Sequence, residues 1–269
     1  MKYLLFFLFM FMPLFSYADE VIDSLIVRVE YYVQAKNIIE QDLGTDLYAL
    51  EIGNMRSRFH NMTKQQYNEA YAEYCGDNHT IEMFLKFFNA PNRPPQYNCG
   101  YDIYRNYPKE GLFTTTDVIR REFFYICEDS IPQLEWELLE GDTIIATYPC
   151  QKAICEFHGR KWTAWYTLDI PYEYGPWKLC GLPGLILTAW DNENFFSFEC
   201  VKIEYDQTSP IVFESGNYEK CTTKRLNELK YDFWQDQMGF MSIKYGEKTT
   251  GNFPGSPQKI FTFCPMEKF

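Results

Sequence analysis

Segment 175–187 constrains the fold more than any other part of the chain. It reads GPWKLCGLPGLIL, so Gly-Pro and Pro-Gly steps bracket a short apolar run. Such breaks force the backbone to turn tightly before it enters a buried strand at residues 185–188. We expect Gly184 to adopt a positive φ, or to lie where the backbone passes close to another strand. The residues of this structural motif are Gly175, Pro176, Gly181, Leu182, Pro183, Gly184, Leu185 and Ile186.

Apolar residues at every second position predict that most of the chain is β-strand. Residues 27–33 show this best, because Val27, Val29, Tyr31 and Val33 share one face. Within 195–205 the apolar parity shifts, which predicts a β-bulge near Cys200–Val201. Turn signals predict hairpins at 140–142 and 158–160. Further strands are expected at 48–52, 123–127, 134–139, 143–148, 153–157, 161–168 and 185–188.

Helical spacing appears in three shorter segments. Thr63 and Gln66 form a capping box before the first helix, and the second helix follows Thr80. Thr222 or Thr223 caps a third helix, which Gly239 is expected to end. We therefore predict an α+β, mostly β fold. Its antiparallel meander forms a strongly curved sheet or partly open barrel, with two or three short helices packed on it.

Residues 1–18 have the features of a signal peptide. Lys2 supplies a positive charge, residues 3–15 are almost wholly apolar, and Ser16-Tyr17-Ala18 offers small residues at a cleavage site. We expect a mature domain at 19–269, located in the periplasm or secreted. No cysteine follows the cleavage site to carry a lipid anchor. No later segment approaches the ~18 apolar residues that a spanning helix needs.

The net charge of the chain disfavours one class of partner. The formal net charge is −12, which disfavours phosphate backbones, so no nucleic-acid partner is expected. Aromatic residues make up 19% of the chain. That share suits a large core, and it also suits an aromatic-lined groove for an apolar or small-molecule ligand.

Cysteine content points to an oxidising compartment. All nine cysteines follow residue 18, so disulfides are expected, and the odd number leaves at least one thiol unpaired. Cys75–Cys99 is our preferred pair, because these residues flank the helical segment. Zinc would favour paired Cys-x-x-Cys or clustered histidines, and neither is present, so no metal is expected.

Three ordered blocks extend the pattern around the motif. They are Tyr148–Ala153, Gly159–Pro171 and Gly175–Leu187. Together they resemble the GLPGLI family, a group of exported bacterial proteins typical of Bacteroidota. The resemblance is strongest from residue 136 to about 205. It implies export to the cell envelope, and no biochemical activity is established for that family.

Several residues near the motif are candidates for ligand binding. Trp165 and Tyr166 are neighbours on one strand, so they point to opposite faces, one into the core and the other free to line a cleft. Arg160 follows a predicted turn and is expected to pair with Glu156 or Glu173. The binding candidates are Arg160, Trp165, Tyr166, Trp177 and Lys178.

Motifs for catalysis are missing from the sequence. It contains no Gly-x-Ser-x-Gly elbow, no His-Glu-x-x-His and no phosphate loop, so we predict no catalytic residue and no cofactor. Three functions remain open. The first is an exported binding or carrier-like protein, by analogy with periplasmic carriers that wrap a half-barrel around a cavity. The others are an envelope accessory protein that docks partner proteins and an unrecognised hydrolase.

Overall fold

Two antiparallel meanders build most of the molecule. The computed structural model describes residues 19–36, 45–76, 80–97, 100–119, 123–206, 208–245 and 263–268. The strands of the first meander are β2 (Val27–Ala35), β3 (Thr45–Ile52), β4 (Ser57–Asn61), β5 (Asp102–Arg105), β6 (Leu112–Ile119) and β7 (Phe123–Ser130). Those of the second are β8 (Glu137–Ile145), β9 (Tyr148–Phe157), β10 (Arg160–Thr167), β11 (Leu185–Asp191) and β12 (Phe196–Tyr205).

Pairing between β2 and β12 joins the two meanders into one sheet. Its order is β14-β7-β6-β5-β4-β3-β2-β12-β11-β10-β9-β8, where β14 (Glu219–Lys220) adds in parallel to β7. A separate pair of strands, β1 (Glu20–Ser24) and β13 (Pro210–Phe213), forms a small second sheet. The β-rich, largely antiparallel fold expected from the sequence is confirmed.

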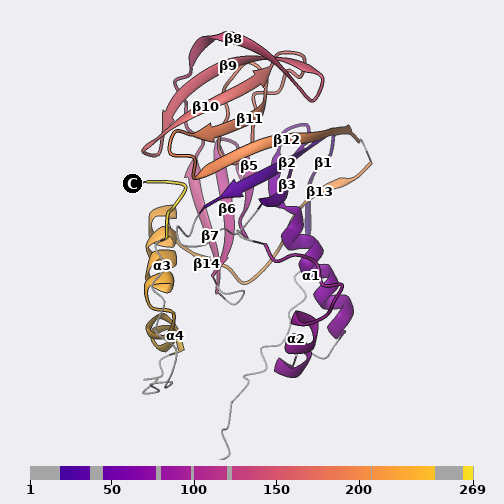
Figure 1. Cartoon of the computed structure of the whole chain (residues 1–269), viewed down its shortest axis with the longest axis vertical. Coiled ribbons are helices and arrows are strands. Elements are labelled where there is room, and N and C mark those ends of the chain that lie inside the picture. The colour runs from indigo at the N-terminus through magenta and orange to yellow at the C-terminus, as the bar shows by residue number, and fades with distance from the viewer. Residues whose placement is uncertain are drawn as a thin grey trace, which may run out of the picture.

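A short connection shows that the large sheet is strongly curved. β7 and β8 are separated by ten strand spacings, which would be roughly 48 Å in a flat sheet. Residues 131–136, which connect the two strands, reach at most about 25 Å. The sheet therefore rolls without closing, and Figure 1 shows β8 to β11 lying across the upper ends of β5 to β7.

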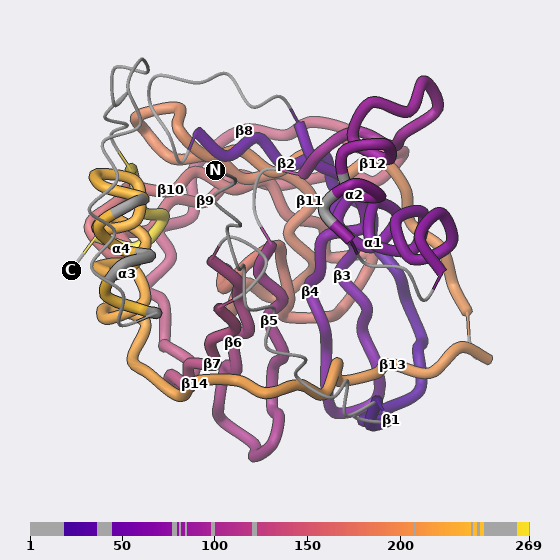
Figure 2. The backbone as a smooth tube through the Cα atoms, turned by 90° about the horizontal axis from the view of Figure 1, so that it is seen from below, coloured from indigo at the N-terminus to yellow at the C-terminus, as the bar shows by residue number. Residues whose placement is uncertain are grey.

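Four helices occupy two sides of the molecule. α1 (Met62–Cys75) and α2 (Ile81–Phe88) lie opposite α3 (Thr223–Gln235) and α4 (Gln237–Tyr245) in both views (Figure 1, Figure 2). Thr80 and Thr222 cap α2 and α3 as expected. The predicted cap at Thr63 is wrong, because Asn61 accepts the Lys64 amide and the Thr63 hydroxyl binds the Leu47 amide. Gly239 does not end α3, which stops at Gln235, and it lies inside α4.

The main core lies inside the curve of the sheet. Leu185, Ile186 and Leu187 of β11 are all fully buried, so this strand is covered on both faces, as its apolar run predicts. The Tyr31 hydroxyl donates a hydrogen bond to the Ile186 carbonyl at 2.7 Å and ties β2 to β11. The last residues of the motif, Leu185 and Ile186, therefore lie in the core rather than at a surface.

Of the two predicted hairpin turns, the one at 158–160 is confirmed and the one at 140–142 is wrong. His158 and Gly159 both have positive φ and connect β9 to β10, as expected. The turn predicted at 140–142 is wrong, because β8 continues through it with a register shift between Leu139 and Asp142. The chain reverses instead at Ala146 and Thr147, which both have positive φ. The predicted bulge is confirmed by a shift between Cys200 and Lys202.

Two earlier expectations fall on residues outside the description. The predicted signal peptide, 1–18, is one of them, and Cys99 of the proposed Cys75–Cys99 pair is the other. The eight cysteines that the structure describes are all free thiols, so the disulfides expected from the sequence are not formed among them. Within the described ranges, no helix has the length and apolar character to cross a membrane.

Candidate functional site

Residues 175–184 of the motif form a loop, called the signature loop below, that packs directly on neighbouring backbone. A Cβ atom on Gly184 would lie 2.0 Å from the Thr167 carbonyl oxygen, closer than any real contact allows. One on Gly175 would lie 2.8 Å from the Leu179 carbonyl oxygen. Gly181 instead needs glycine for its φ of +89°. The close approach expected at Gly184 is therefore confirmed, and the loop acts as a clamp before β11.

Trp177 lies in the core rather than beside an open cleft. Its side chain is buried, and its ring centroid is 5.3 Å from those of both Phe157 and Trp162. It also has a φ of 57°, a left-handed conformation that is unusual for a bulky residue. The indole packs on Phe157 of β9 and Trp162 of β10, and these contacts hold the strained backbone in place.

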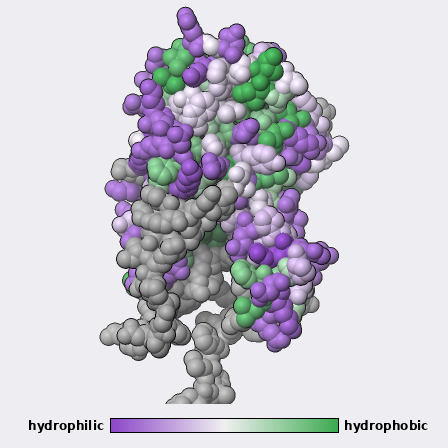
Figure 3. Space-filling model, in the orientation of Figure 1, coloured by the Kyte–Doolittle hydropathy of each residue, from purple (hydrophilic) through white to green (hydrophobic). Residues whose placement is uncertain are grey.

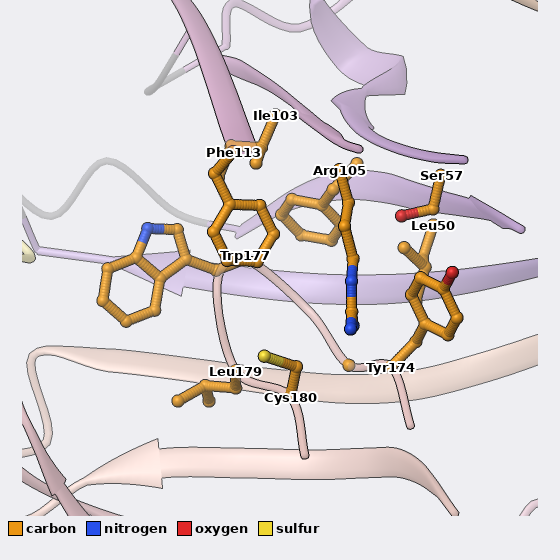
Figure 4. Close-up of a pocket in the computed structure, with 11 residues that line it drawn as sticks. Leu50, Ser57, Ile103, Arg105, Phe113, Tyr174, Trp177, Leu179 and Cys180 are labelled. Carbon is orange, nitrogen blue, oxygen red and sulfur yellow. The ribbon is translucent and has the colours of Figure 1, made fainter. Parts of the chain in front are cut away.

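A small apolar pocket lies between the loop and the first meander (Figure 4). Its volume is about 10 Å³, which is room for about one water molecule. The Arg105 guanidinium lies 4.4 Å from the centroid of the Tyr174 ring at this pocket. The labelled residues are Leu50, Ser57, Ile103, Arg105, Phe113, Tyr174, Trp177, Leu179 and Cys180. The pocket is too small for a lipid or any other organic ligand.

Arg160 is fully buried, and acceptors surround it. It binds Asp191 at 2.6 Å and Glu193 at 2.8 Å, so the pairing expected with Glu156 or Glu173 is wrong. Glu156 lies opposite Lys161 in the β9–β10 ladder and therefore on the other face of the sheet from Arg160. The remaining N–H groups of Arg160 bind the Met266 and Pro265 carbonyls and the Cys264 sulfur.

Lys178 makes the second contact with the same C-terminal segment, residues 263–268. Its ammonium is 2.7 Å from Glu267 and 2.8 Å from Asp129, and it is almost wholly buried. Burial alone would lower the pKa of Lys178, but Glu267 and Asp129 outweigh burial and raise it. The two basic residues selected from the sequence therefore hold the chain's own C-terminal segment. No local pattern in 263–268 indicated this.

Trp165 and Tyr166 take opposite faces of β10, as predicted. Tyr166 is buried in the core and donates a hydrogen bond to Gln151 at 2.8 Å. Trp165 is partly buried and lies 5.8 Å from the Lys152 ammonium. Neither residue lines the pocket of Figure 4 or the groove described next.

An open groove of about 580 Å³ lies beside the start of the signature loop. Tyr174, which precedes Gly175, lines both this groove and the small pocket. The Asp23 carboxylate accepts the backbone amides of Met55 and Arg56, and these bonds outweigh burial to lower the pKa of Asp23. The lining residues are Ile22, Asp23, Asn54, Met55, Arg56, Asn106, Glu110 and Tyr174. The groove is mostly polar, and Tyr174 is its single aromatic.

A buried cluster of charges covers the outer face of β3 to β5. Asp102 is fully buried and binds Arg58 at 2.7 Å and Lys64 at 2.5 Å. Burial would raise the pKa of Asp102, but these two cations lower it to about 2. His60 lies 3.6 Å from Glu51, too far for a hydrogen bond, and neither ring nitrogen has a hydrogen-bond partner among the described residues.

The His60–Glu51 pair is one histidine–carboxylate arrangement in the described residues, and it lacks access. Both side chains are nearly buried, and neither lines the groove or the small pocket. The described residues hold no group of three or more His, Cys, Asp or Glu side chains arranged to bind a metal ion. The geometry thus brings charges together without offering a substrate a way in.

Comparison with known proteins identifies one sequence region. Residues 155–188, which include the loop from Gly175 to Gly184, match a family model described as "Protein of unknown function (Porph_ging)". No curated protein matches the chain. Two solved structures of PNGF-II, in space groups P21 and C2, are similar at 12% identity and a TM-score of 0.48. They cover 76% of this chain, which spans about a third of their length (33% and 32%).

Proposed function

We propose that this chain is a GLPGLI-type exported protein of the bacterial cell envelope that binds a small polar ligand without catalysis. The open groove beside Tyr174 carries the proposal. Its volume of about 580 Å³ lies within the ~300–1,000 Å³ usual for ligand sites. Tyr174, the residue before the signature loop, lines this groove.

Charge in the groove favours a ligand with a positive group. Asp23 and Glu110 are acidic, and Arg56 is the one basic residue in the lining. The Arg56 guanidinium donates to the Ile22 carbonyl at 2.8 Å and keeps its charge, so the lining carries one more negative than positive charge. Glu110 is exposed and free to approach a ligand amine. We therefore propose a polar molecule with an ammonium group, such as a short cationic peptide.

The rest of the molecule supports binding over catalysis. The aromatic-lined pocket holds about one water, so the interior offers no lipid-sized space there. Asp23 is occupied by backbone amides, which favour its ionised form and leave it a poor proton acceptor. The hydrolase alternative is weaker, because the His60–Glu51 pair is buried and a substrate would need access to it.

Titration calorimetry with two tripeptides tests this assignment. We expect Lys-Ala-Lys to bind more tightly than Glu-Ala-Glu, and Glu110→Gln to weaken Lys-Ala-Lys binding roughly three- to tenfold through loss of one charge-assisted contact. Glu137→Gln is the matched control, because Glu137 is exposed on β8 and outside the groove. Equal binding of both peptides, or equal loss in both variants, would contradict the proposal.

Docking of a partner protein is the second candidate, supported by the free edge of β8. That strand ends the sheet, and it exposes 61% of Leu138 and 76% of Ile144. Figure 1 places β8 at the upper end of the molecule, where Figure 3 shows hydrophobic groups at the surface. Against docking, the register shift near Glu140 and the acidic residues there disrupt strand addition. Native mass spectrometry of protein purified from its own periplasm separates the two, because it retains a bound small molecule or a bound protein.

A further inference from the structure

Two cysteine side chains meet where β14 pairs with β7. The parallel register aligns Lys220 with Ile126, so the next residues, Cys221 and Cys127, face each other. The Cys221 amide donates to the Ile126 carbonyl at 3.0 Å, which fixes the two backbones as neighbours. Their Sγ atoms are 3.5 Å apart. We propose that Cys127 and Cys221 form a disulfide bond in the exported protein.

Backbone geometry favours this bond. Neighbouring strands lie roughly 4.8 Å apart, and disulfides join Cα atoms separated by about 4.4–6.8 Å. The sulfurs must approach from 3.5 Å to the ~2.05 Å of an S–S bond. Rotation of the two side chains covers that distance, since the paired backbones already have suitable spacing.

The two thiols differ in access, which sets the order of the reaction. Cys221 is partly exposed, whereas Cys127 is fully buried. Cys221 thiolate attacks the disulfide of an oxidant, such as a disulfide oxidoreductase, and releases one thiol of that oxidant. Cys127 then loses its proton and attacks the Cys221 sulfur, which releases the second thiol. The protein loses two protons and two electrons, and the oxidant gains them.

The pKa values of both thiols favour an external oxidant over spontaneous reaction. Burial raises the pKa of Cys127, and the neighbouring Cys221 raises it further. Burial also raises the pKa of Cys221, although Arg225 and Lys244 act in the opposite direction. Cys221, with two cations near it and partial exposure, is the thiol that reacts first.

The bond would fasten α3 to the end of the sheet. Thr223, at the start of α3, donates to the Asp129 carboxylate at 2.6 Å, and Asn227 donates to the Glu267 carbonyl. Asp129 and Glu267 are the two partners of Lys178. The disulfide therefore stabilises the frame that holds the C-terminal segment against the signature loop.

Peptide mapping tests the bond directly. The exported protein is alkylated without reduction and digested with trypsin and a glutamate-specific protease, which isolates Cys127 in residues 123–128 and Cys221 in residues 221–224. We expect these two peptides joined, at their summed mass less two hydrogens. Recovery of both peptides in alkylated form overturns the proposal.

The disulfide depends on the proposed export only for its oxidising compartment, and it does not depend on the proposed ligand binding. The following experiments therefore test the bond separately from both. Reduced protein treated with oxidised glutathione should form the same linkage in vitro, even if export is wrong. Cys127→Ser should leave Cys221 open to alkylation, and Cys221→Ser should leave Cys127 alkylated after denaturation, whereas the control Cys264→Ser should retain the linked peptides. Reductant should lower the Tm of the wild type but not of the Cys127→Ser/Cys221→Ser variant. An equal shift in Tm in the wild type and the double variant would contradict a stabilising disulfide between Cys127 and Cys221.

Discussion

Two buried arginines on the sheet differ in how completely they are satisfied. Arg160, on the second meander, places all five N–H groups on acceptors: two carboxylates, two backbone carbonyls and one sulfur. Arg58, on the first meander, binds Asp102 and Glu214 but leaves its Nε buried without a hydrogen-bond partner among the described residues.

The aspartates that pair with the two arginines also differ in their other hydrogen-bond partners. Asp191, beside Arg160, also accepts the amides of Phe195 and Phe196, so the carboxylate is fixed. Asp102, beside Arg58, is shared with Lys64, and the ring nitrogens of nearby His60 have no hydrogen-bond partner within the described part of the chain. The comparison indicates that the Arg160 site is a completed structural clamp, whereas the Arg58 site can lose one cation and still keep Asp102 paired.

Removing the clamp should have the largest effect. Arg160→Met leaves Asp191 buried without its cation and removes three hydrogen bonds to residues 263–268, so we expect the free energy of unfolding to fall by about 3–5 kcal/mol. Urea unfolding followed by tryptophan fluorescence measures it. Arg225→Met is the control, because its pair with Glu228 is exposed and should contribute less than about 1 kcal/mol. Similar losses in both variants would break the comparison.

Glycine substitutions test the packing of the loop before β11, which is separate from the Arg160 site. Gly184→Ala drives a methyl group into the Thr167 carbonyl and should cost roughly 2–3 kcal/mol, because strand backbone must shift. Gly181→Ala meets no atom within 4 Å and is strained only by its positive φ, so its cost should be about 1 kcal/mol. Thermal unfolding of both variants tests the order. A larger loss at Gly181 would contradict the close-packing argument.

Breaking the other site should cost less. Arg58→Met leaves Asp102 paired with Lys64, so we expect a loss of about 1–2 kcal/mol in urea unfolding. Lys64→Met is the matched variant on the same carboxylate. The double variant should lose clearly more than the sum of the two, because only then is Asp102 without a cation. Strict additivity would show that the two cations do not substitute for each other.

Sequence patterns predicted strands with one polar and one apolar face. β2, β9, β10 and β12 alternate, so their positions followed from the residues alone. β4 to β6 were missed because polar residues are buried on their outer face, which removes the contrast that alternation needs. β6, with four consecutive buried polar residues from Thr114 to Asp117, shows this most clearly.

Candidate residues were found more readily than their partners. Arg160 and Lys178 were identified as charged residues near a distinctive loop, but their partners Met266 and Glu267 lie far along the sequence. Ion pairs between segments brought together only by the fold leave no local pattern. The groove was missed for the same reason, since its lining comes from β1, the β3–β4 turn, residues 106–110 and Tyr174.

The smallest predicted effect concerns Glu51 and the acid stability of the first meander. Burial would raise the pKa of Glu51, but His60, Arg28 and Arg58 together lower it to about 2. Because the folded-state pKa lies below the unfolded value, this stabilisation is complete above about pH 4.5 and is lost as the pH falls through about 2.

A pKa lowered from 4.5 to about 2 corresponds to at most about 3 kcal/mol, and a glutamine amide still accepts the hydrogen bond from Arg28. We therefore expect Glu51→Gln to be less stable than the wild type by about 1 kcal/mol at pH 7, with the gap closing as the pH approaches 2. Urea unfolding at pH 7, 4 and 2.5 measures the gap, and Glu82→Gln is the control because Glu82 is exposed on α2. A gap that stays constant with pH would mean that Glu51 packs there without using its charge. In that case the cations around Arg58 would not stabilise the first meander through Glu51, and the difference between the two arginine sites would rest on Asp102 and Asp191 alone.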